Sequence, residues 1–328
     1  MNPAEQQYTH TAVAHANIAI AKYWGKRDEQ LNLPLFDSVA FGVNDLCTQT
    51  TATWSDEATE DALYIDGWHV PLQRIERMQR MMDIIRTQKG WSKKCVLHSH
   101  NAFAHSSGLA SSASGAAAAA YAMSCAAGLD LSPAELSVLA RHGSGSAARS
   151  IHAGWTRWRA GSQADGSDSY AVQFASPDHW PLNVFVVQLS SARKPVSSTE
   201  CMKQCELSPF WQTYCAEASA AADIAQKAVT DRNFGALAAA AHHNAMMLHA
   251  LIMSCPQPVC YFEPQTIAVV QKIFKMSTAI PVCCTIDAGP NVVVLCEDIA
   301  CPFVKNEIMA IGVPFIQTTI GGGTKTAA

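Results

Sequence analysis

The chain has 328 residues, of which 49% are hydrophobic and 15% are charged, and this is the balance of a globular protein. Its formal net charge of −4 at pH 7 provides no basic field for binding nucleic acid or anionic lipid. Single hydrophobic cores stop growing near ~250–300 residues, so the length favours two domains with a small-molecule site between them.

The cysteine pattern and the lack of long apolar runs together predict the cellular compartment of the protein. The 12 cysteines include no CxxC pair and no familiar zinc spacing, so we expect reduced thiols packed as small hydrophobic residues. The N-terminal segment has no basic start before an apolar run, and no stretch reaches the ~18 apolar residues of a membrane span. We expect a soluble, cytoplasmic protein with no membrane partner and no nucleic-acid partner.

Strands and helices alternate in the first half of the chain. A capping box of Ser132 and Glu135, with Pro133 at the first helical position, begins a helix that should stop at Gly143. Apolar residues at helical spacing and an alanine-rich run predict two further helices. The expected strands are 11–20, 46–54, 61–67, 95–100 and 154–161, and the expected helices are 72–88, 116–127 and 132–143.

The second half begins with a continuous apolar strand at 183–189, and we place a domain boundary just before it, around residues 176–181. The predicted domains are therefore 1–182 and 183–328. Downstream we expect helices at 208–229, 234–253, 264–276 and 300–310, a strand pair within 282–296, and a final strand at 314–319.

A dense cluster of small residues, "SSGLASSASG" at 106–115, precedes the alanine-rich helix. It lacks the lysine of a Walker A loop, but Gly108 lets backbone N–H groups approach a phosphate, and the helix dipole favours an anion there. Ser111 and Ser112 add hydroxyl donors. The alternative is a tight loop that only caps a packing helix, and composition does not separate the two.

Two more clusters suit an anionic substrate. In "RHGSGSAARS" at 141–150, two serines and Arg149 lie within one short turn, and arginine binds carboxylate or phosphate bidentately. The alternative is a glycine-rich turn with a surface arginine. In "IDAGPN" at 286–291, Asp287 ends an apolar strand, either as a turn-former or as a base or orienting group for a substrate hydroxyl.

Histidine pairs are the remaining candidates for metal ligands. His98 and His100 would share one face of a strand, and His242 and His243 lie in one predicted helix. No third ligand stands at a fixed spacing, so we expect surface or core histidines and no metal site.

Five segments, in this order and at these separations, resemble the mevalonate diphosphate decarboxylases of the GHMP kinase superfamily. The resemblance covers the chain from about Val13 to the glycine-rich tail. The segments are "NIAIAKYWGKRDEQLNLPL" at 17–35, "GLASSASG" at 108–115, "GSGSAARS" at 143–150, "KPVSSTECM" at 194–202 and "TIDAGPN" at 285–291.

The resemblance implies an α+β fold, with an N-terminal β-α-β domain that contains the phosphate loop and a C-terminal ferredoxin-like domain. It implies ATP-dependent conversion of mevalonate 5-diphosphate to isopentenyl diphosphate, carbon dioxide, ADP and phosphate, a step of isoprenoid synthesis. ATP with Mg²⁺ would be the cofactors, and a homodimer the assembly.

The resemblance also implies roles for individual residues. Asp287 would face the tertiary hydroxyl, Arg149 with Asn17 would hold the carboxylate, and Lys22 would stabilise developing charge. Ser112 would touch ATP and the transferring phosphoryl group. The remaining implied substrate-binding residues are Tyr23, Trp24, Gly25, Lys26, Arg74, Ser144, Gly145, Ser146, Ser198 and Thr199, and the implied ATP-binding residues are Ser107, Gly108, Leu109, Ala110, Ser111 and Ser112.

Some positions depart from the family pattern. Phe36 and Asp37 replace Asn-Ser after the Leu-Pro-Leu segment, which puts an unexpected carboxylate near an anionic substrate. His105 and Ser106 begin the phosphate loop differently, and "NAMMLHA" at 244–250 replaces an Asp-Ser-Asn-x-Phe-His-Ala pattern.

These departures leave alternatives open. The first is an enzyme of the superfamily that decarboxylates mevalonate 5-phosphate or only phosphorylates the 3-hydroxyl. Others are a homoserine-type kinase and a catalytically silent binding protein with the same fold.

Overall fold

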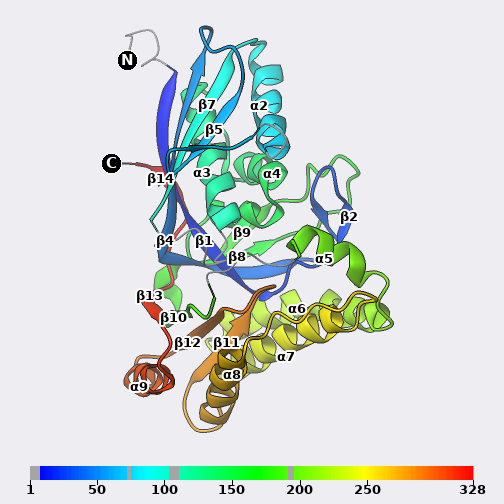
Figure 1. Ribbon diagram of the computed structural model, residues 1–328, viewed down its shortest axis with the longest axis vertical. Helices are drawn as coiled ribbons and strands as arrows, with labels where there is room; N and C mark the ends of the chain where they lie inside the picture. The colour runs from blue at the N-terminus through cyan, green and yellow to red at the C-terminus, as the bar shows by residue number, and fades with distance from the viewer. Residues whose placement is uncertain (1–7, 72–74, 103–110, 191–195, 328) are drawn as a thin grey trace.

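The computed structural model describes residues 8–71, 75–102, 111–190 and 196–327. It contains a large sheet with three helices on one face, and a smaller sheet with a second set of helices (Figure 1). Within the described ranges, no helix combines the length and the apolar character that a membrane crossing requires.

The large sheet has eight strands in the path β14-β1-β4-β7-β5-β6, with β8 pairing to β4 and β9 pairing to β8. Alternate alanines of β1 point inward and are fully buried, as expected for a strand with one covered face. The strands are β1 (Thr9–Ala21), β4 (Ser38–Ser55), β5 (Ala62–Ile65), β6 (Trp68–His69), β7 (Lys94–Asn101), β8 (Trp155–Trp158), β9 (Ala171–Ala175) and β14 (Thr324–Thr326). Strands β2 (Lys26–Asp28) and β3 (Leu33–Pro34) form a separate hairpin.

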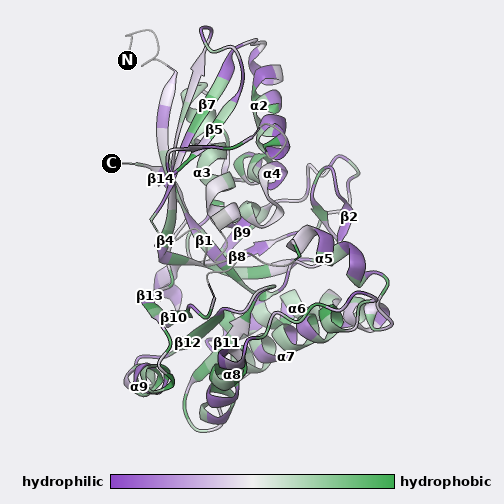
Figure 2. Ribbon diagram, viewed as in Figure 1, coloured by the Kyte–Doolittle hydropathy of each residue, from purple (hydrophilic) through white to green (hydrophobic). Residues whose placement is uncertain are grey.

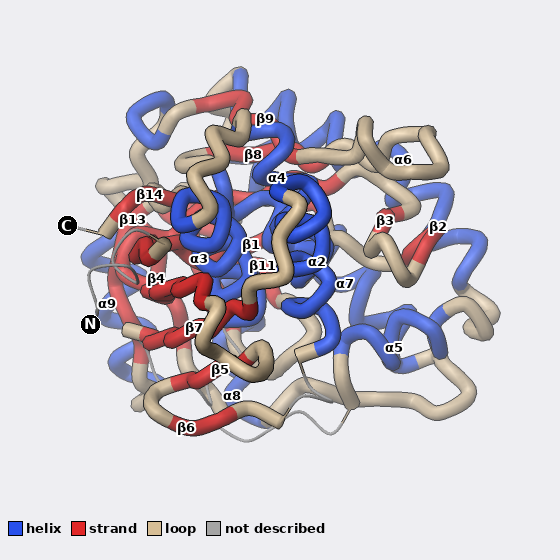
Figure 3. The backbone as a smooth tube through the Cα atoms, turned by 90° about the horizontal axis from the view of Figure 1, so that it is seen from above, coloured by secondary structure: helices blue, strands red, loops and turns tan. Residues whose placement is uncertain are grey.

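Helices α2 (Glu76–Lys89), α3 (Ser111–Ala126) and α4 (Pro133–Gly143) lie together on one face of the large sheet (Figures 1 and 3). The alanine run 116–120 of α3 is buried on every side. Small side chains let this helix pack closely on β1 and β4, so α3 is the central element of this layer.

The smaller sheet is antiparallel throughout, in the order β11-β12-β10-β13. One core cluster joins it to the large sheet, because Ile18 and Ile20 of β1 pack with Val184, Leu295 and alanines of the helices. Figure 2 shows hydrophobic residues along these strands. The elements are β10 (Asn183–Val187), β11 (Val282–Ile286), β12 (Val292–Cys296), β13 (Phe315–Thr319), α5 (Ser198–Cys205), α6 (Trp211–Thr230), α7 (Phe234–Met253), α8 (Pro264–Met276) and α9 (Cys301–Ile311).

Several local predictions are confirmed. The capping box of Ser132 and Glu135 is present with Pro133 in the first turn, and α4 ends at Gly143. Helices α7 and α8 have the predicted bounds, and β11 ends immediately before Asp287. These elements depend on local signals that neighbouring structure does not overrule.

Other predicted boundaries of strands and helices are wrong. β4 begins at Ser38 rather than 46, because it pairs with β8 at one end and with β1 along its length. α3 begins at Ser111, five residues earlier than expected, and α6 begins at Trp211 rather than 208.

Several elements were not expected from the sequence, among them the short strands β2, β3 and β6 and a 3-10 helix at Pro177–His179. Residues 145–151 form a 3-10 helix rather than a simple turn, and α5, β9 and β14 are additional. Because β14 pairs with β1, the end of the chain returns to the first sheet. The division into 1–182 and 183–328 stays a prediction.

Candidate active site

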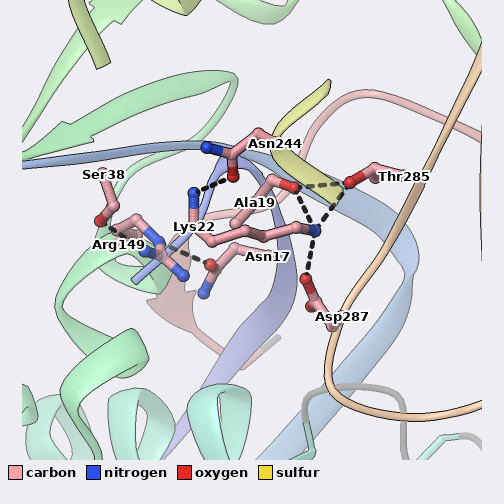
Figure 4. A network of polar contacts seen from close by, with 8 residues as sticks. All are labelled: Asn17, Ala19, Lys22, Ser38, Arg149, Asn244, Thr285 and Asp287. Atoms are coloured by element: carbon pink, nitrogen blue, oxygen red, sulfur yellow. Dashed lines mark hydrogen bonds and ion pairs between the residues drawn. The ribbon is translucent and has the colours of Figure 1, made fainter. Parts of the chain in front are cut away.

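Polar side chains from distant segments meet where β1 ends (Figure 4). We call this set the buried network. Its core consists of Asn17 in β1, Lys22 directly after β1, Arg149 in the 3-10 helix and Asp287 directly after β11. The supporting partners in the same view are Ala19, Ser38, Asn244 and Thr285.

Lys22 and Asp287 form an ion pair, with Lys22 Nζ 2.6 Å from Asp287 Oδ1. The lysine side chain is 3% exposed and the aspartate side chain 46%, so the carboxylate faces open space. Lys22 Nζ also donates to the carbonyl of Ala19 at 2.9 Å and to Oγ1 of Thr285 at 2.7 Å, which occupies all three ammonium donors. Burial lowers the pKa of Lys22, and the attraction of Asp287 opposes that effect.

Arg149 is also buried, but its partners are neutral. Its Nε donates to Asn17 Oδ1 at 2.9 Å and its Nη1 donates to Ser38 Oγ at 2.6 Å. Asn17 is itself held by the carbonyl of Ser146 at 3.0 Å and the hydroxyl of Ser150 at 2.8 Å. Burial lowers the pKa of Arg149 to about 10. A buried cation bound by an amide and a hydroxyl is suited to an anionic ligand that supplies the opposite charge.

Tyr23 lies beside this network with its ring centroid 4.7 Å from that of Trp158. Its hydroxyl is buried and has no hydrogen-bond partner among the described residues. A Cβ added to Gly145 would lie 2.6 Å from the Tyr23 oxygen, so only glycine fits there. Ser144 and Ser146, on either side of Gly145, are half-buried. The Tyr23 hydroxyl is therefore available to a partner that is not among the described residues, such as a ligand.

A second group of cations comes from three elements, and we call it the cationic wall: Lys26 of β2, Arg77 of α2 and Lys203 of α5. Arg77 Nη2 donates to Thr199 Oγ1 at 3.3 Å, and Lys26 Nζ donates to Asn32 Oδ1 at 2.8 Å. Burial, together with the charges of Arg77 and Lys203, lowers the pKa of Lys26 to about 8. The predicted Ser198 and Thr199 are the first two residues of α5.

Two residues of this wall, Arg77 and Lys203, were missed by sequence reasoning. A signal for Arg77 existed in the sequence, because three residues separate it from the predicted Arg74, which would put both on one face of the helix expected at 72–88. Lys203 had none, because α5 itself was not predicted.

Two of the other predicted substrate-binding residues, Trp24 and Gly25, have packing contacts. Trp24 is 4% exposed and lies in a core cluster with Cys201 and Cys205. Gly25 has φ +94°, and an added Cβ would meet Leu35 at 2.8 Å, so its glycine is required by the turn itself. Arg74 lies outside the described residues.

The predicted ATP-binding segment is described only in part. Ser107, Gly108, Leu109 and Ala110 lie outside the described residues, as do His105 and Ser106. Ser111 is the first residue of α3, and Ser112 follows it and is exposed. In the part of the chain that the structure describes, no group of three or more His, Cys, Asp or Glu side chains is placed to hold a metal ion.

The departures from the family pattern have structural explanations. The Asp37 carboxylate accepts from Arg157 Nε at 2.7 Å and from the backbone N–H of Ala160 at 2.8 Å, so its charge is neutralised locally. Asn244 Oδ1 accepts the backbone N–H of Lys22 at 2.9 Å. Phe36 packs against the core cluster that contains Trp24.

The fold and the arrangement of this site define a class, the GHMP kinase-like two-domain proteins of mixed α and β structure. Two family sequence models match the chain: the diphosphomevalonate decarboxylase-like N-terminal domain at residues 14–171, and the mevalonate 5-diphosphate decarboxylase C-terminal domain at residues 184–317. The chain belongs to the diphosphomevalonate decarboxylase family.

Curated relatives and solved structures agree. The chain is 35% identical to the diphosphomevalonate decarboxylase of Bos taurus and 34% identical to that of Homo sapiens, in each case over 88% of this chain and 76% of the relative. The mevalonate diphosphate decarboxylase of Staphylococcus aureus superposes with a TM-score of 0.90 at 31% identity, covering 98% of both chains. A structure described as MDDEF in complex with MVAPP, AMPPCP and magnesium superposes with a TM-score of 0.89 at 29% identity, covering 97% of this chain and 98% of that chain.

Proposed function

We propose that this protein catalyses the ATP-dependent decarboxylation of mevalonate 5-diphosphate to isopentenyl diphosphate, with release of ADP, phosphate and carbon dioxide. The observation that supports it best is one open carboxylate, Asp287, beside two buried cations, Lys22 and Arg149. Family membership supports the same reaction, because the relatives are named for it.

Asp287 acts on the tertiary hydroxyl of the substrate. Its partly exposed carboxylate accepts the hydroxyl hydrogen and orients the oxygen for attack on the γ-phosphorus of ATP. The new O–P bond forms as the bond from phosphorus to the ADP oxygen breaks. Lys22 stays paired with Asp287 and holds that carboxylate in position.

Arg149 holds the substrate carboxylate. Its two bonds to Asn17 and Ser38 fix the guanidinium plane, and its charge is left for the ligand. Phosphate then departs with the electrons of the C–O bond, carbon dioxide departs, and the electrons of the broken C–C bond form the product double bond. Fixed geometry supplies much of the catalysis.

The diphosphate binds between Tyr23 and the cationic wall. The Tyr23 hydroxyl, Lys26 and the N-terminus of α5 with Ser198 and Thr199 supply donors, and Ser144 and Ser146 supply two more from the other side. Lys203 is paired with Glu29 at 2.7 Å, so Lys26 and Arg77 supply the positive charge of the wall that favours a diphosphate over a monophosphate.

ATP binds with its phosphates at the N-terminus of α3, where the N–H groups of the first helical turn and the exposed Ser112 fit an anion. Mg²⁺ bound to ATP would neutralise part of the phosphate charge. The homodimer implied by the family resemblance and the cytoplasmic location indicated by the composition stay predictions.

Product analysis tests this function. Purified protein is incubated with ATP, Mg²⁺ and either mevalonate 5-diphosphate or mevalonate 5-phosphate, and the products are identified by mass spectrometry. We expect isopentenyl diphosphate from the first substrate. Isopentenyl phosphate from the second substrate alone, or a phosphorylated product that keeps its carboxylate, would replace the proposal with one of the two superfamily alternatives.

A further inference from the structure

Thr285, which none of the roles above uses, contacts the lysine of the buried network. It is fully buried on β11, two residues before Asp287. Successive side chains of a strand point to opposite faces, so Thr285 points to the same side as Asp287, while Ile286 points into the core of the smaller sheet.

The Thr285 hydroxyl takes part in a small closed set of hydrogen bonds. Its oxygen accepts from Lys22 Nζ at 2.7 Å, and its hydrogen is donated to the carbonyl of Ala19 at 3.1 Å. Lys22 Nζ donates to that same carbonyl at 2.9 Å. Because the hydroxyl hydrogen is used by Ala19, a lone pair of the oxygen points at the ammonium group.

This arrangement fixes the position of the ammonium group. Lys22 has a long, flexible side chain. The bond to Asp287 by itself would orient only one of the three N–H donors of the ammonium group. The two further acceptors, from β1 and β11, set the other two directions. Loss of either would leave a buried ammonium donor unpaired, which is unfavourable in a low-dielectric site.

We propose that Thr285 is a positioning residue for the reaction: its hydroxyl holds Lys22 Nζ beside Asp287, so that the pair is aligned toward the hydroxyl that is phosphorylated. The inference rests on the proposed function. It assigns Thr285 an effect on the chemical step and none on substrate binding.

Three variants separate the hydroxyl from the shape of the side chain. Thr285→Val keeps the branched shape and removes the hydroxyl, and Thr285→Ser keeps the hydroxyl and removes a methyl group. Thr50→Val is the matched control, because Thr50 is another fully buried strand threonine, and its hydroxyl bonds Ser99 of β7 at 2.9 Å, away from the site. Folding is checked by thermal unfolding, and Thr285→Ala replaces the valine variant if that variant does not fold.

We expect Thr285→Val to lower kcat about 10- to 100-fold with KM for both substrates within about twofold of wild type. Thr285→Ser should recover most of the loss, and Thr50→Val should leave kcat unchanged. A wild-type kcat in Thr285→Val, an equal loss in Thr285→Ser, or an equal loss in Thr50→Val would each overturn the proposal.

The dependence of kcat on pH gives a second test. A simple loss of packing would not shift the alkaline limb of this pH profile. The charged groups around Lys22 are Asp287 and Arg149, and the neighbouring Cys284 thiol is neutral because burial raises its pKa to about 12. An acceptor favours the charged amine, so its removal should shift this limb to lower pH in Thr285→Val and leave it in place in Thr285→Ser.

The same titration can be followed without turnover, by ¹⁵N-lysine NMR with the Lys22 signal assigned from Lys22→Arg. A lowered Lys22 pKa in Thr285→Val supports the contact even if wild-type protein does not convert mevalonate 5-diphosphate, so the two failures are distinguishable. An unchanged Lys22 pKa in that variant would overturn the proposal.

Discussion

The buried network and the cationic wall use the same residue types in opposite ways. In the buried network, Lys22 and Arg149 are at most 5% exposed, and protein acceptors hold all three donors of Lys22 and the Nε and Nη1 atoms of Arg149. In the cationic wall, Arg77 and Lys203 are exposed, and only Lys26 is half-buried. A preorganised network should act on the chemical step, whereas a solvated wall should act on substrate affinity.

The largest expected effect is that of Asp287→Asn. It keeps the size of the side chain and removes the carboxylate that accepts the hydroxyl hydrogen, so kcat should fall about 10²- to 10⁴-fold with little change in KM. Steady-state kinetics checks this. The control is Asp231→Asn, which removes a surface carboxylate paired with Lys227, and a similar loss there would argue against a specific role for Asp287.

Arg149→Gln should separate function from stability. We expect kcat to fall about 10²- to 10³-fold, because the substrate carboxylate loses its cation. The thermal unfolding temperature should stay the same or rise, because the variant no longer buries a charge among neutral partners, and Gln retains donors for Asn17 and Ser38. Unchanged turnover together with a large loss of stability would show that Arg149 is structural instead.

The half-buried Lys26 should produce a pH effect on binding. Its pKa is lowered to about 8, so Lys26 loses its charge as the pH rises through about 8, and kcat/KM for the diphosphate substrate should fall there. Lys26→Gln should have a lower kcat/KM at pH 7 and lack this inflection. An inflection that persists in the variant would assign it to another group.

The same shift has a consequence for folding, with the opposite sign. Because the pKa of Lys26 is lowered in the folded protein, the unfolded chain binds more protons between pH 8 and the usual lysine pKa of 10.5. The contribution of this group to the free energy of unfolding therefore rises with pH across that window. Denaturant titrations of wild type and Lys26→Gln at several pH values check the sign.

Arg77→Gln should have the smallest effect, because its side chain is exposed. We expect KM for mevalonate 5-diphosphate to rise about threefold to tenfold with kcat unchanged, the size of one hydrogen bond to a charged group. Lys89→Gln removes a charge at the far end of the same helix and should change neither constant. Equal effects of the two variants would indicate only a change in net charge.

Much of the local structure and the core of the site could be predicted from the sequence. The capping box at Ser132 and Glu135 and the apolar strand that ends at Asp287 depend on residues close together in the chain, so their signals are complete within a short window. Arg149 was singled out from its motif and Lys22 from the family resemblance, and the structure places both in the buried network, while their roles stay predictions.

Only the tertiary structure decided which of these residues meet. The bond from Thr285 to Lys22 joins residues 263 positions apart, and the bond from Arg77 to Thr199 joins residues 122 positions apart. The sequence around one residue of such a pair does not indicate which distant residue it contacts. A threonine in an apolar strand is typical of any β-sheet. The sequence determined which chemical groups are present and where the locally signalled elements, such as α4 and β11, end. The packing of the two sheets determined which of these groups pair. It buries the Thr285 hydroxyl 2.7 Å from Lys22 Nζ, and in a buried site the loss of such a bond is costly.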